Sequence, residues 1–239
     1  MIQKGSIDDF GMIMSISALR EVNDNIAKAA DRYGTRLQDK LPSLVAVSKT
    51  FDAKDIEPVL EAGQRIFGEN RVQESQKKWP QLKEKYPDVE LHLIGPLQTN
   101  KVKDAVALFD VIQSVDREKL ARALAKEFER VGKSLPIFIQ VNIGAEEQKA
   151  GIDPNDALSF VELCRDELKL DVQGLMCIPP NGVPAAPYFA QMKELADRAG
   201  LSQLSMGMSA DYELAVEMGA THVRVGSAIF GTRPKPLPH

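Results

Sequence analysis

Lys49 stands at the end of an apolar run. Residues 43–48 include four consecutive apolar side chains, a pattern typical of a strand that is buried on both faces, as in a parallel sheet. A cation at the end of such a strand is costly unless it reaches solvent along its own methylene chain or points into a pocket. In a pocket, the Lys49 amine is a nucleophile suited to a carbonyl group.

Two later segments have the residue types that hold a phosphate group. Gly207-Met208-Ser209 leads into a predicted helix, where free backbone N–H groups and the helix dipole attract an anion and the Ser209 hydroxyl adds a donor. Gly226-Ser227 follows a predicted strand, and the glycine allows close backbone approach beside a second hydroxyl. For Ser209 the alternative is a plain helix N-cap.

Arg224 alternates with two valines in the last predicted strand, residues 222–226. If the valines face the covering helices, strand alternation turns Arg224 inward, and the same parity turns Lys49 inward. A buried guanidinium group needs an acceptor. That acceptor is either a bound ligand or an internal carboxylate, for which Glu69 and Asp211 are the candidates.

Strand and helix patterns alternate about eight times along the 239 residues, with no change of composition that marks a linker. This alternation predicts a single closed (β/α)₈ barrel of the TIM type, with an open doubly wound sheet as the alternative. We expect strands at residues 43–48, 65–68, 91–95, 111–114, 136–141, 172–178, 204–207 and 222–226.

The helix signals set the domain limits. We expect the first helix at residues 17–33, after a flexible leader at 1–14; the barrel domain spans 15–233, and 234–239 form a loose tail. A helix that begins near Asn70 is expected to be interrupted at Trp79-Pro80, because proline removes an intrahelical donor.

The barrel brings the chemical groups together. Barrel sites lie at the carboxyl ends of the strands, and phosphate commonly binds after strands 7 and 8. Since the first strand neighbours the last, Lys49, Arg224 and the phosphate-binding segments converge. These groups match pyridoxal 5'-phosphate (PLP): the lysine forms a Schiff base with its aldehyde, and hydroxyl and N–H donors hold its phosphate. A guanidinium facing the pyridine nitrogen does not protonate it, which weakens the ring as an electron sink.

The composition argues against several classes of binding partner and site. The formal net charge is -4, which argues against nucleic-acid and anionic-membrane partners. Two cysteines and three histidines, without ligand spacing, indicate neither a disulfide framework nor a metal site. No apolar stretch approaches the roughly 20 residues that cross a bilayer, and the first 14 residues do not resemble a signal peptide. We therefore expect a cytoplasmic protein.

From Leu44 to Arg233 the sequence resembles the pyridoxal phosphate homeostasis proteins. The resemblance rests on ordered motifs, which include Ala46-Val47-Ser48-Lys49-Thr50, Phe67-Gly68-Glu69-Asn70-Arg71-Val72, His92-Leu93-Ile94-Gly95-Pro96-Leu97-Gln98-Thr99-Asn100-Lys101, Leu204-Ser205-Met206-Gly207-Met208-Ser209 and Val223-Arg224-Val225-Gly226-Ser227.

The resemblance implies a barrel similar to the N-terminal domain of alanine racemase, with PLP on Lys49. It also implies phosphate contacts at Ser209, Gly226 and Ser227, Arg224 near the pyridine nitrogen, and Asn70 facing the cofactor. Family members are thought to bind, buffer or hand over PLP without a dedicated enzymatic reaction. The implied partners are PLP and apo forms of PLP-dependent enzymes, and we expect a monomer or a weak dimer.

Two other functions fit parts of the pattern. A PLP-dependent amino-acid racemase needs acid/base groups on both faces of the substrate carbon, and the four tyrosines are all expected on or near helices. A Schiff-base aldolase would use Lys49 without PLP. We expect His92 to pack at the barrel wall, His222 to be structural, and Cys177 to be a buried neutral thiol at the end of the sixth strand.

Overall fold

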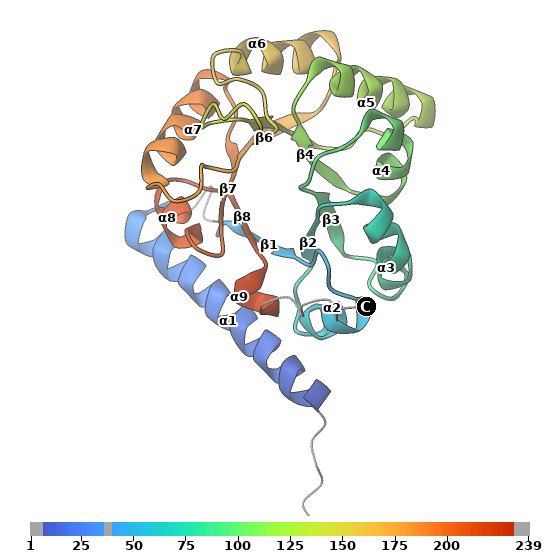
Figure 1. The fold of residues 1–239 in the computed structure, drawn as a ribbon, viewed down its shortest axis with the longest axis vertical. Coiled ribbons are helices and arrows are strands. Elements are labelled where there is room, and N and C mark those ends of the chain that lie inside the picture. The colour runs from blue at the N-terminus through green and yellow to red at the C-terminus, as the bar shows by residue number, and fades with distance from the viewer. Residues whose placement is uncertain (1–6, 36–39, 232–239) are drawn as a thin grey trace, which may run out of the picture.

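Eight parallel strands close into a barrel in the order of the sequence (Figure 1). The structure is a computed structural model that describes residues 7–35 and 40–231. β8 pairs with β1, which closes the barrel and excludes an open sheet; the predicted TIM-type barrel is confirmed. The strands are β1 (Ser43–Val47), β2 (Ile66–Glu69), β3 (Glu90–Leu93), β4 (Val111–Val115), β5 (Ile137–Val141), β6 (Val172–Cys177), β7 (Gln203–Met208) and β8 (His222–Val225).

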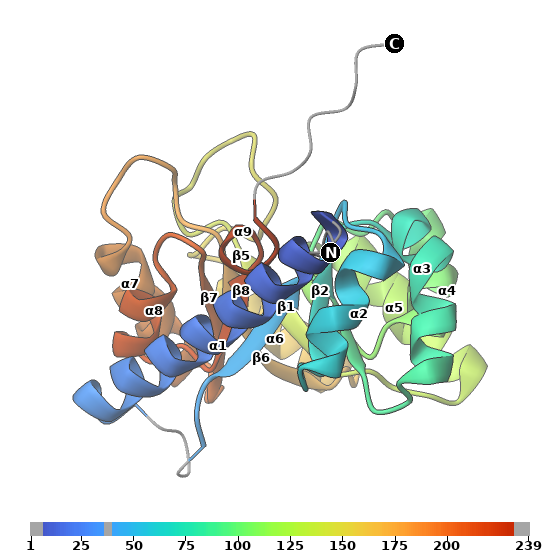
Figure 2. The same ribbon diagram turned by 90° about the horizontal axis from the view of Figure 1, so that it is seen from below.

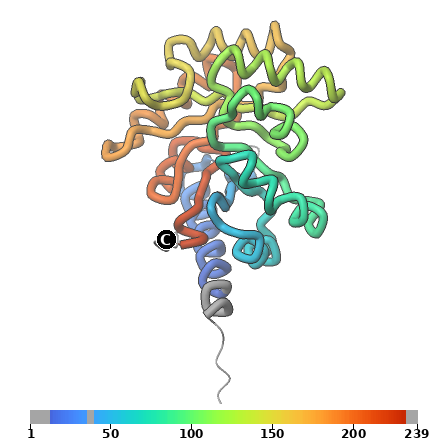
Figure 3. Tube along the Cα trace, turned by 45° about the vertical axis from the view of Figure 1, so that its right-hand side comes forward, coloured from blue at the N-terminus to red at the C-terminus, as the bar shows by residue number. Residues whose placement is uncertain are grey.

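Helices cover the outside of the barrel. They are α1 (Ile7–Tyr33), α2 (Ala53–Glu61), α3 (Val72–Lys85), α4 (Val102–Leu108), α5 (Glu118–Val131), α6 (Ala157–Glu162), α7 (Ala186–Arg198), α8 (Tyr212–Glu217) and α9 (Ser227–Phe230), with the short helices η1 (Thr99–Lys101) and η2 (Leu163–Glu167). α9 is too short to cover β8. α1 instead packs against α8, α9 and α2 and fills the eighth helix position, as Figures 1 and 3 show.

α1 begins earlier than the sequence pattern indicates. Its first residue is Ile7, so the expected flexible leader is helical over residues 7–14. The apolar stripe of this helix, which includes Leu19, Val22 and Ile26, is buried. Because no proline lies between residues 7 and 33, the helix can extend from residue 17 back toward the N-terminus. Residues 1–6 of the leader and the expected tail at 234–239 lie outside the described residues.

α3 runs through Pro80 to Lys85, so the expected interruption at Trp79-Pro80 is wrong. The Trp79 ring is fully buried and packs against Phe67, with 5.1 Å between ring centroids. Its indole N–H also donates to Oε1 of Glu69 at 3.0 Å. These contacts outweigh the single intrahelical hydrogen bond that proline removes.

The barrel wall separates two interiors. The main apolar core lies between the strands and the helices, where Leu44 and Ala46 of β1 are buried. Inside the barrel, Val111, Phe138 and Met176 form a small separate cluster, and the remaining space holds polar side chains such as Gln113 and Arg224. Among the described residues, no helix has the length and apolar character that a membrane crossing requires.

Candidate functional site

A cavity of about 600 Å³ opens at the carboxyl ends of the strands. It contains all six residues proposed for cofactor binding, contributed by the ends of β1, β2, β7 and β8. Figure 2 shows the loops that follow β5 and β6 rising on the same side of the barrel as α9. The lining residues are Val47, Lys49, Phe51, Asn70, Ile94, Ile178, Met208, Ser209, Ala210, Arg224, Gly226, Ser227 and Gly231.

A second hollow, of about 690 Å³, lies outside the barrel between the end of α5 and the segment after η2. It is lined by residues of α5, such as Arg122 and Lys126, and of the loops that follow α5 and η2, such as Lys133 and Lys169. No strand end opens into it. In a barrel the chemistry belongs to the strand ends, so the smaller cavity is the candidate site.

Lys49 is partly exposed and is the second residue after the end of β1. The backbone on both sides of it is held by α3, because Nζ of Lys78 donates to the carbonyl oxygens of Ser48 and Phe51, each at 2.9 Å. The Ser48 hydroxyl donates to Oε1 of Glu69 at 2.6 Å. Thr50 has a φ of 70°, which turns the chain sharply after the lysine. The loop that presents Lys49 is therefore tied to the barrel wall.

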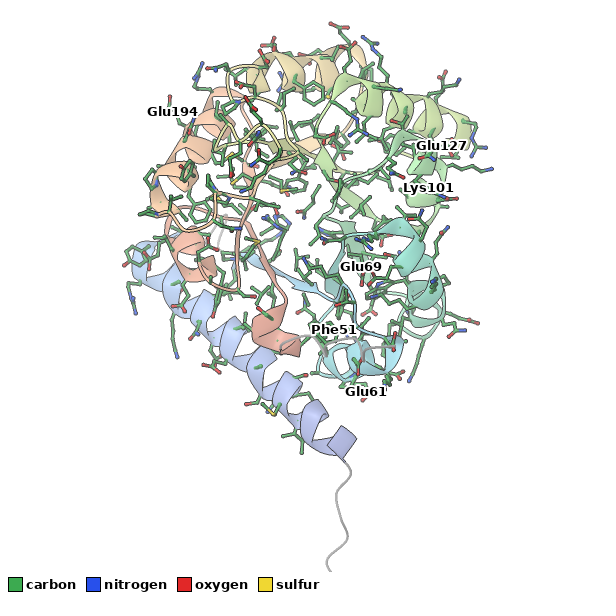
Figure 4. All side chains as sticks on the ribbon, viewed as in Figure 1. Phe51, Glu61, Glu69, Lys101, Glu127 and Glu194 are labelled. Atoms are coloured by element: carbon green, nitrogen blue, oxygen red, sulfur yellow. The ribbon has the colours of Figure 1, made fainter. Side chains whose placement is uncertain are left out.

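Glu69 and Lys78 form a buried ion pair outside the barrel. Their Oε1 and Nζ atoms are 2.8 Å apart, and the two side chains are 0% and 7% exposed. Burial raises the pKa of Glu69, and the nearby Lys78 opposes this rise. Figure 4 labels Glu69 on the α3 side of the barrel wall. The sequence left Glu69 as one possible internal partner of Arg224. In the structure Glu69 lies on the outer face of the barrel wall and binds Lys78 instead.

Arg224 lies inside the barrel and is 4% exposed. One terminal nitrogen donates to Oγ of Ser205 and the other to the carbonyl oxygen of Cys177, both at 2.7 Å. Burial lowers the pKa of Arg224, and Asp211 opposes this effect. Within residues 7–35 and 40–231, no carboxylate forms an ion pair with Arg224, so Asp211 is not its direct partner either.

Ser209 links the two segments expected to hold a phosphate. Its hydroxyl oxygen accepts hydrogen bonds from the backbone N–H groups of Gly226 at 3.3 Å and Ala228 at 3.5 Å. The alternative role of Ser209, as the N-cap of the next helix, is wrong. Asp211 is the N-cap of α8, and its carboxylate accepts from the N–H of Met208 at 2.7 Å. The Ser209 hydroxyl is therefore directed toward β8 instead of α8.

Two glycines lie in the segments expected to hold a phosphate: glycine is required at Gly207, and an added side chain would be tightly packed at Gly226. Gly207 has a φ of +88°, and an added Cβ would lie 2.4 Å from Cβ of Ala215. At Gly226 an added Cβ would lie 3.1 Å from the carbonyl oxygen of Val47. The end of β8 consequently packs directly on β1. Ser227, the first residue of α9, is exposed beside it.

Asn70 follows β2 and is partly exposed in the cavity. Its backbone packs on Gly95, where an added Cβ would lie 2.3 Å from the Asn70 carbonyl oxygen. Phe51, which also lines the cavity, stacks on Phe230 with 5.0 Å between centroids, and Figure 4 labels Phe51 near α2 and α9.

The apolar wall residues were missed in the sequence. Ile94 and Ile178 follow β3 and β6, so continued strand parity would have placed them. Phe51 carries no such signal, because it lies in a loop.

Three other residues that stood out in the sequence do not line the cavity. His92 is buried inside the barrel, 2.7 Å from Nε2 of Gln113. Burial lowers the pKa of His222 to about 3, so this imidazole is neutral. Cys177 packs in the core outside the barrel, where burial raises its pKa to about 12. Among the described residues, no cluster of histidine, cysteine and carboxylate side chains could hold a metal ion.

Fold and site together define a class of barrel that carries a lysine at the end of its first strand. Residues 19–234 match the family described as "Alanine racemase, N-terminal domain". The alanine racemase of Bartonella henselae, solved with covalently bound pyridoxal phosphate, has a TM-score of 0.71 over 95% of this chain and 62% of its own. The two are 17% identical, so this likeness concerns the fold alone.

Relatives with higher sequence identity show which family within this class the chain belongs to. The pyridoxal phosphate homeostasis protein of Aquifex aeolicus is 39% identical over 90% of this chain and 96% of its own, and the human protein of that name is 37% identical over 92% and 88%. PipY of Synechococcus elongatus, solved with PLP bound, is 40% identical, with a TM-score of 0.73 over 85% of this chain and all of PipY. This chain belongs to the pyridoxal phosphate homeostasis protein family.

Proposed function

We propose that this protein binds PLP in the cavity at the strand ends and acts in intracellular PLP (vitamin B6) homeostasis, with PLP held as a Schiff base on Lys49. The observation that carries the proposal is the convergence of an amine, a guanidinium and two hydroxyls on one cavity of about 600 Å³. The family supports it, because its members are named for PLP homeostasis and PipY was solved with PLP.

The residues around the cavity fit PLP chemically. The donors suited to a phosphate lie close together: the hydroxyls of Ser209 and Ser227 and the backbone N–H groups of Gly226 and Ala228. The Ser209 hydroxyl oxygen accepts hydrogen bonds from both of these N–H groups. An incoming phosphate would take the place of that hydroxyl as acceptor. Arg224 brings a fixed positive charge to the inner end, and Asn70 adds an amide on the side wall.

When bound, PLP supplies an aldehyde with which the Lys49 amine condenses, with loss of one water. Arg224 keeps its protons throughout, since a guanidinium does not titrate near neutral pH. A ring nitrogen facing it stays unprotonated, which leaves the ring a weak electron sink. In the described part of the chain, no tyrosine lines the cavity to move a proton at a substrate carbon. These features favour a carrier over an enzyme.

The finer features of the proposal concern where and with what the protein acts. We propose a cytoplasmic monomer or weak dimer that exchanges PLP with apo forms of PLP-dependent enzymes. Both cysteines are free and buried, with pKa values raised by burial to about 12, as suits a reducing compartment. A cavity that opens at the strand ends lets PLP enter and leave.

The decisive experiment is an absorption spectrum of the purified protein with added PLP. We expect a visible band that borohydride removes, and a reduced PLP adduct on the Lys49 peptide by mass spectrometry. Lys49→Ala should lose the band and the adduct, while Lys54→Ala, an exposed lysine of α2, should keep both. A wild-type protein that stays colourless with PLP would contradict the proposal.

A second measurement separates the carrier from a racemase. The PLP-loaded protein is incubated with L-alanine and other amino acids, and their chirality is followed over time. We expect no turnover above that of free PLP. Rapid racemisation would instead assign an enzymatic function to the same cavity, which the barrel shared with alanine racemase makes the first alternative to test.

A further inference from the structure

A continuous line of hydrogen-bonded side chains crosses the inside of the barrel. It starts at Arg224 and passes to Ser205 (2.7 Å), then to Gln113 (2.6 Å), then to His92 (2.7 Å), and ends at Glu90 (2.5 Å). We call these five residues the relay. Four of them are buried, whereas the Glu90 side chain is 48% exposed. Glu90 is the first residue of β3, so the relay joins the cavity to the opposite end of the barrel.

The donor in each link is determined by chemistry. A guanidinium only donates, so Oγ of Ser205 accepts from Arg224, and its single proton goes to the carbonyl oxygen of Gln113. The amide nitrogen of Gln113 only donates, so Nδ1 of His92 must be the acceptor. The imidazole proton is then on Nε2 and is donated to Glu90.

The relay and the wall immobilise the guanidinium of Arg224. Ser205 holds one terminal nitrogen from β7, and the carbonyl oxygen of Cys177 holds the other from β6. With both nitrogens engaged, the plane of the guanidinium is fixed. The titratable groups that face His92 are Glu90 on its own strand and, across the barrel, His222 with its ring 6.0 Å away. His222 is neutral, since burial lowers its pKa to about 3, which leaves Glu90 as the charge next to His92.

We propose that Ser205, Gln113, His92 and Glu90 are positioning residues for Arg224, which they orient toward the PLP ring by holding His92 as the neutral Nε2–H tautomer. The orientation toward PLP rests on the function proposed above. The tautomer of His92 does not, because every link of the relay is formed by side chains of the protein alone. A structural role in packing would require neither one tautomer nor an effect on PLP.

The first test uses the full chain without PLP. Proton–nitrogen NMR of imidazole-labelled protein reports which ring nitrogen of His92 carries the proton. We expect Nε2–H in the wild type. Gln113→Glu replaces the donor by an acceptor at nearly equal volume and should move a proton onto Nδ1. The matched control is Gln140→Glu on β5, also inside the barrel but bonded to the Ala150 carbonyl oxygen, which should leave the His92 signals unchanged.

The second test uses PLP. Loss of the Ser205 hydroxyl frees one side of Arg224, so Ser205→Ala should weaken PLP binding about tenfold and shift the absorption band. Ser205→Thr keeps the hydroxyl and should stay within about twofold of the wild type. Gln113→Leu interrupts the relay one step further away and should act in the same direction as Ser205→Ala.

Two results would overturn the positioning role. One is a wild-type His92 protonated on Nδ1, and the other is a folded Ser205→Ala protein with unchanged PLP affinity and spectrum. The tautomer result does not depend on the covalent linkage: Lys49→Ala should lose the adduct and retain the Nε2–H tautomer. If PLP fails to bind the wild type, the proposed function is wrong, while the NMR experiment still decides the relay.

Discussion

Two polar groups of side chains stand behind the two cationic residues of the cavity, and they are built differently. Outside the barrel, Ser48, Glu69, Lys78 and Trp79 form a compact outer cluster in which cation and anion touch at 2.8 Å. Inside the barrel, three side chains, those of Ser205, Gln113 and His92, separate the cation of the relay, Arg224, from its anion, Glu90.

The difference shows two ways of placing a charged group. The outer cluster binds the backbone at Ser48 and Phe51, so it places the loop that carries Lys49. The relay binds the guanidinium of Arg224 itself. One cation is therefore placed through its backbone, and the other through its own charged group.

The largest effect is expected from opening the buried ion pair. Lys78→Met leaves the carboxylate of Glu69 buried without its cation, and we expect it to lower the free energy of unfolding by about 3 to 5 kcal/mol in urea denaturation. Lys77→Met, on the exposed side of the same helix, should change it by less than about 0.5 kcal/mol. Adding Glu69→Gln to Lys78→Met should restore much of the loss. A Lys78→Met protein as stable as the wild type would mean that the ion pair does not support the loop.

A smaller loss of stability is expected from the relay. Ser205→Ala removes the acceptor of one Arg224 nitrogen and the donor to Gln113, which should cost about 1 to 3 kcal/mol. Ser202→Ala, in the exposed segment before β7, is the control. The comparison between the two regions would be reversed if Ser205→Ala destabilised the protein more than Lys78→Met.

The smallest effect is a dependence of stability on pH, with opposite signs in the two regions. The hydrogen bond from His92 lowers the pKa of Glu90 below 4.5, so its contribution is present above pH 4.5 and is lost as the pH falls through the lowered value. Burial raises the pKa of Glu69, so the folded state binds that proton more readily, and stability from this group increases as the pH falls.

These opposite signs are tested by urea denaturation between about pH 3 and 7, the range in which carboxylates titrate. Glu90→Gln should flatten the acid loss, and Glu69→Gln should steepen it. Equal slopes in both variants would contradict the assigned signs.

Most of the site residues could be predicted from the alternation of side chains along the strands. A local alternation of apolar residues in 43–48 and 222–226 was enough to turn Lys49 and Arg224 inward, and the barrel rule then brought them beside Ser209 and Ser227. Such patterns can be read from the sequence because the period of a strand depends only on the residues within it.

Helix limits were predicted less well, because they depend on contacts between distant segments. Pro80 remains within α3 since Trp79 is bound to Glu69 and packed on Phe67. Asp211 instead of Ser209 caps α8, because Ser209 accepts hydrogen bonds from the end of β8.

The amino-acid sequence alone determined the barrel, its eight strands and the six residues that line one cavity at one end. Only the tertiary structure decided that Glu69 belongs to Lys78 and not to Arg224, and that Arg224 continues through Ser205, Gln113 and His92 to Glu90. The physical reason is that periodicity gives the direction of a side chain, whereas its partner depends on the register and closure of strands far apart in the chain.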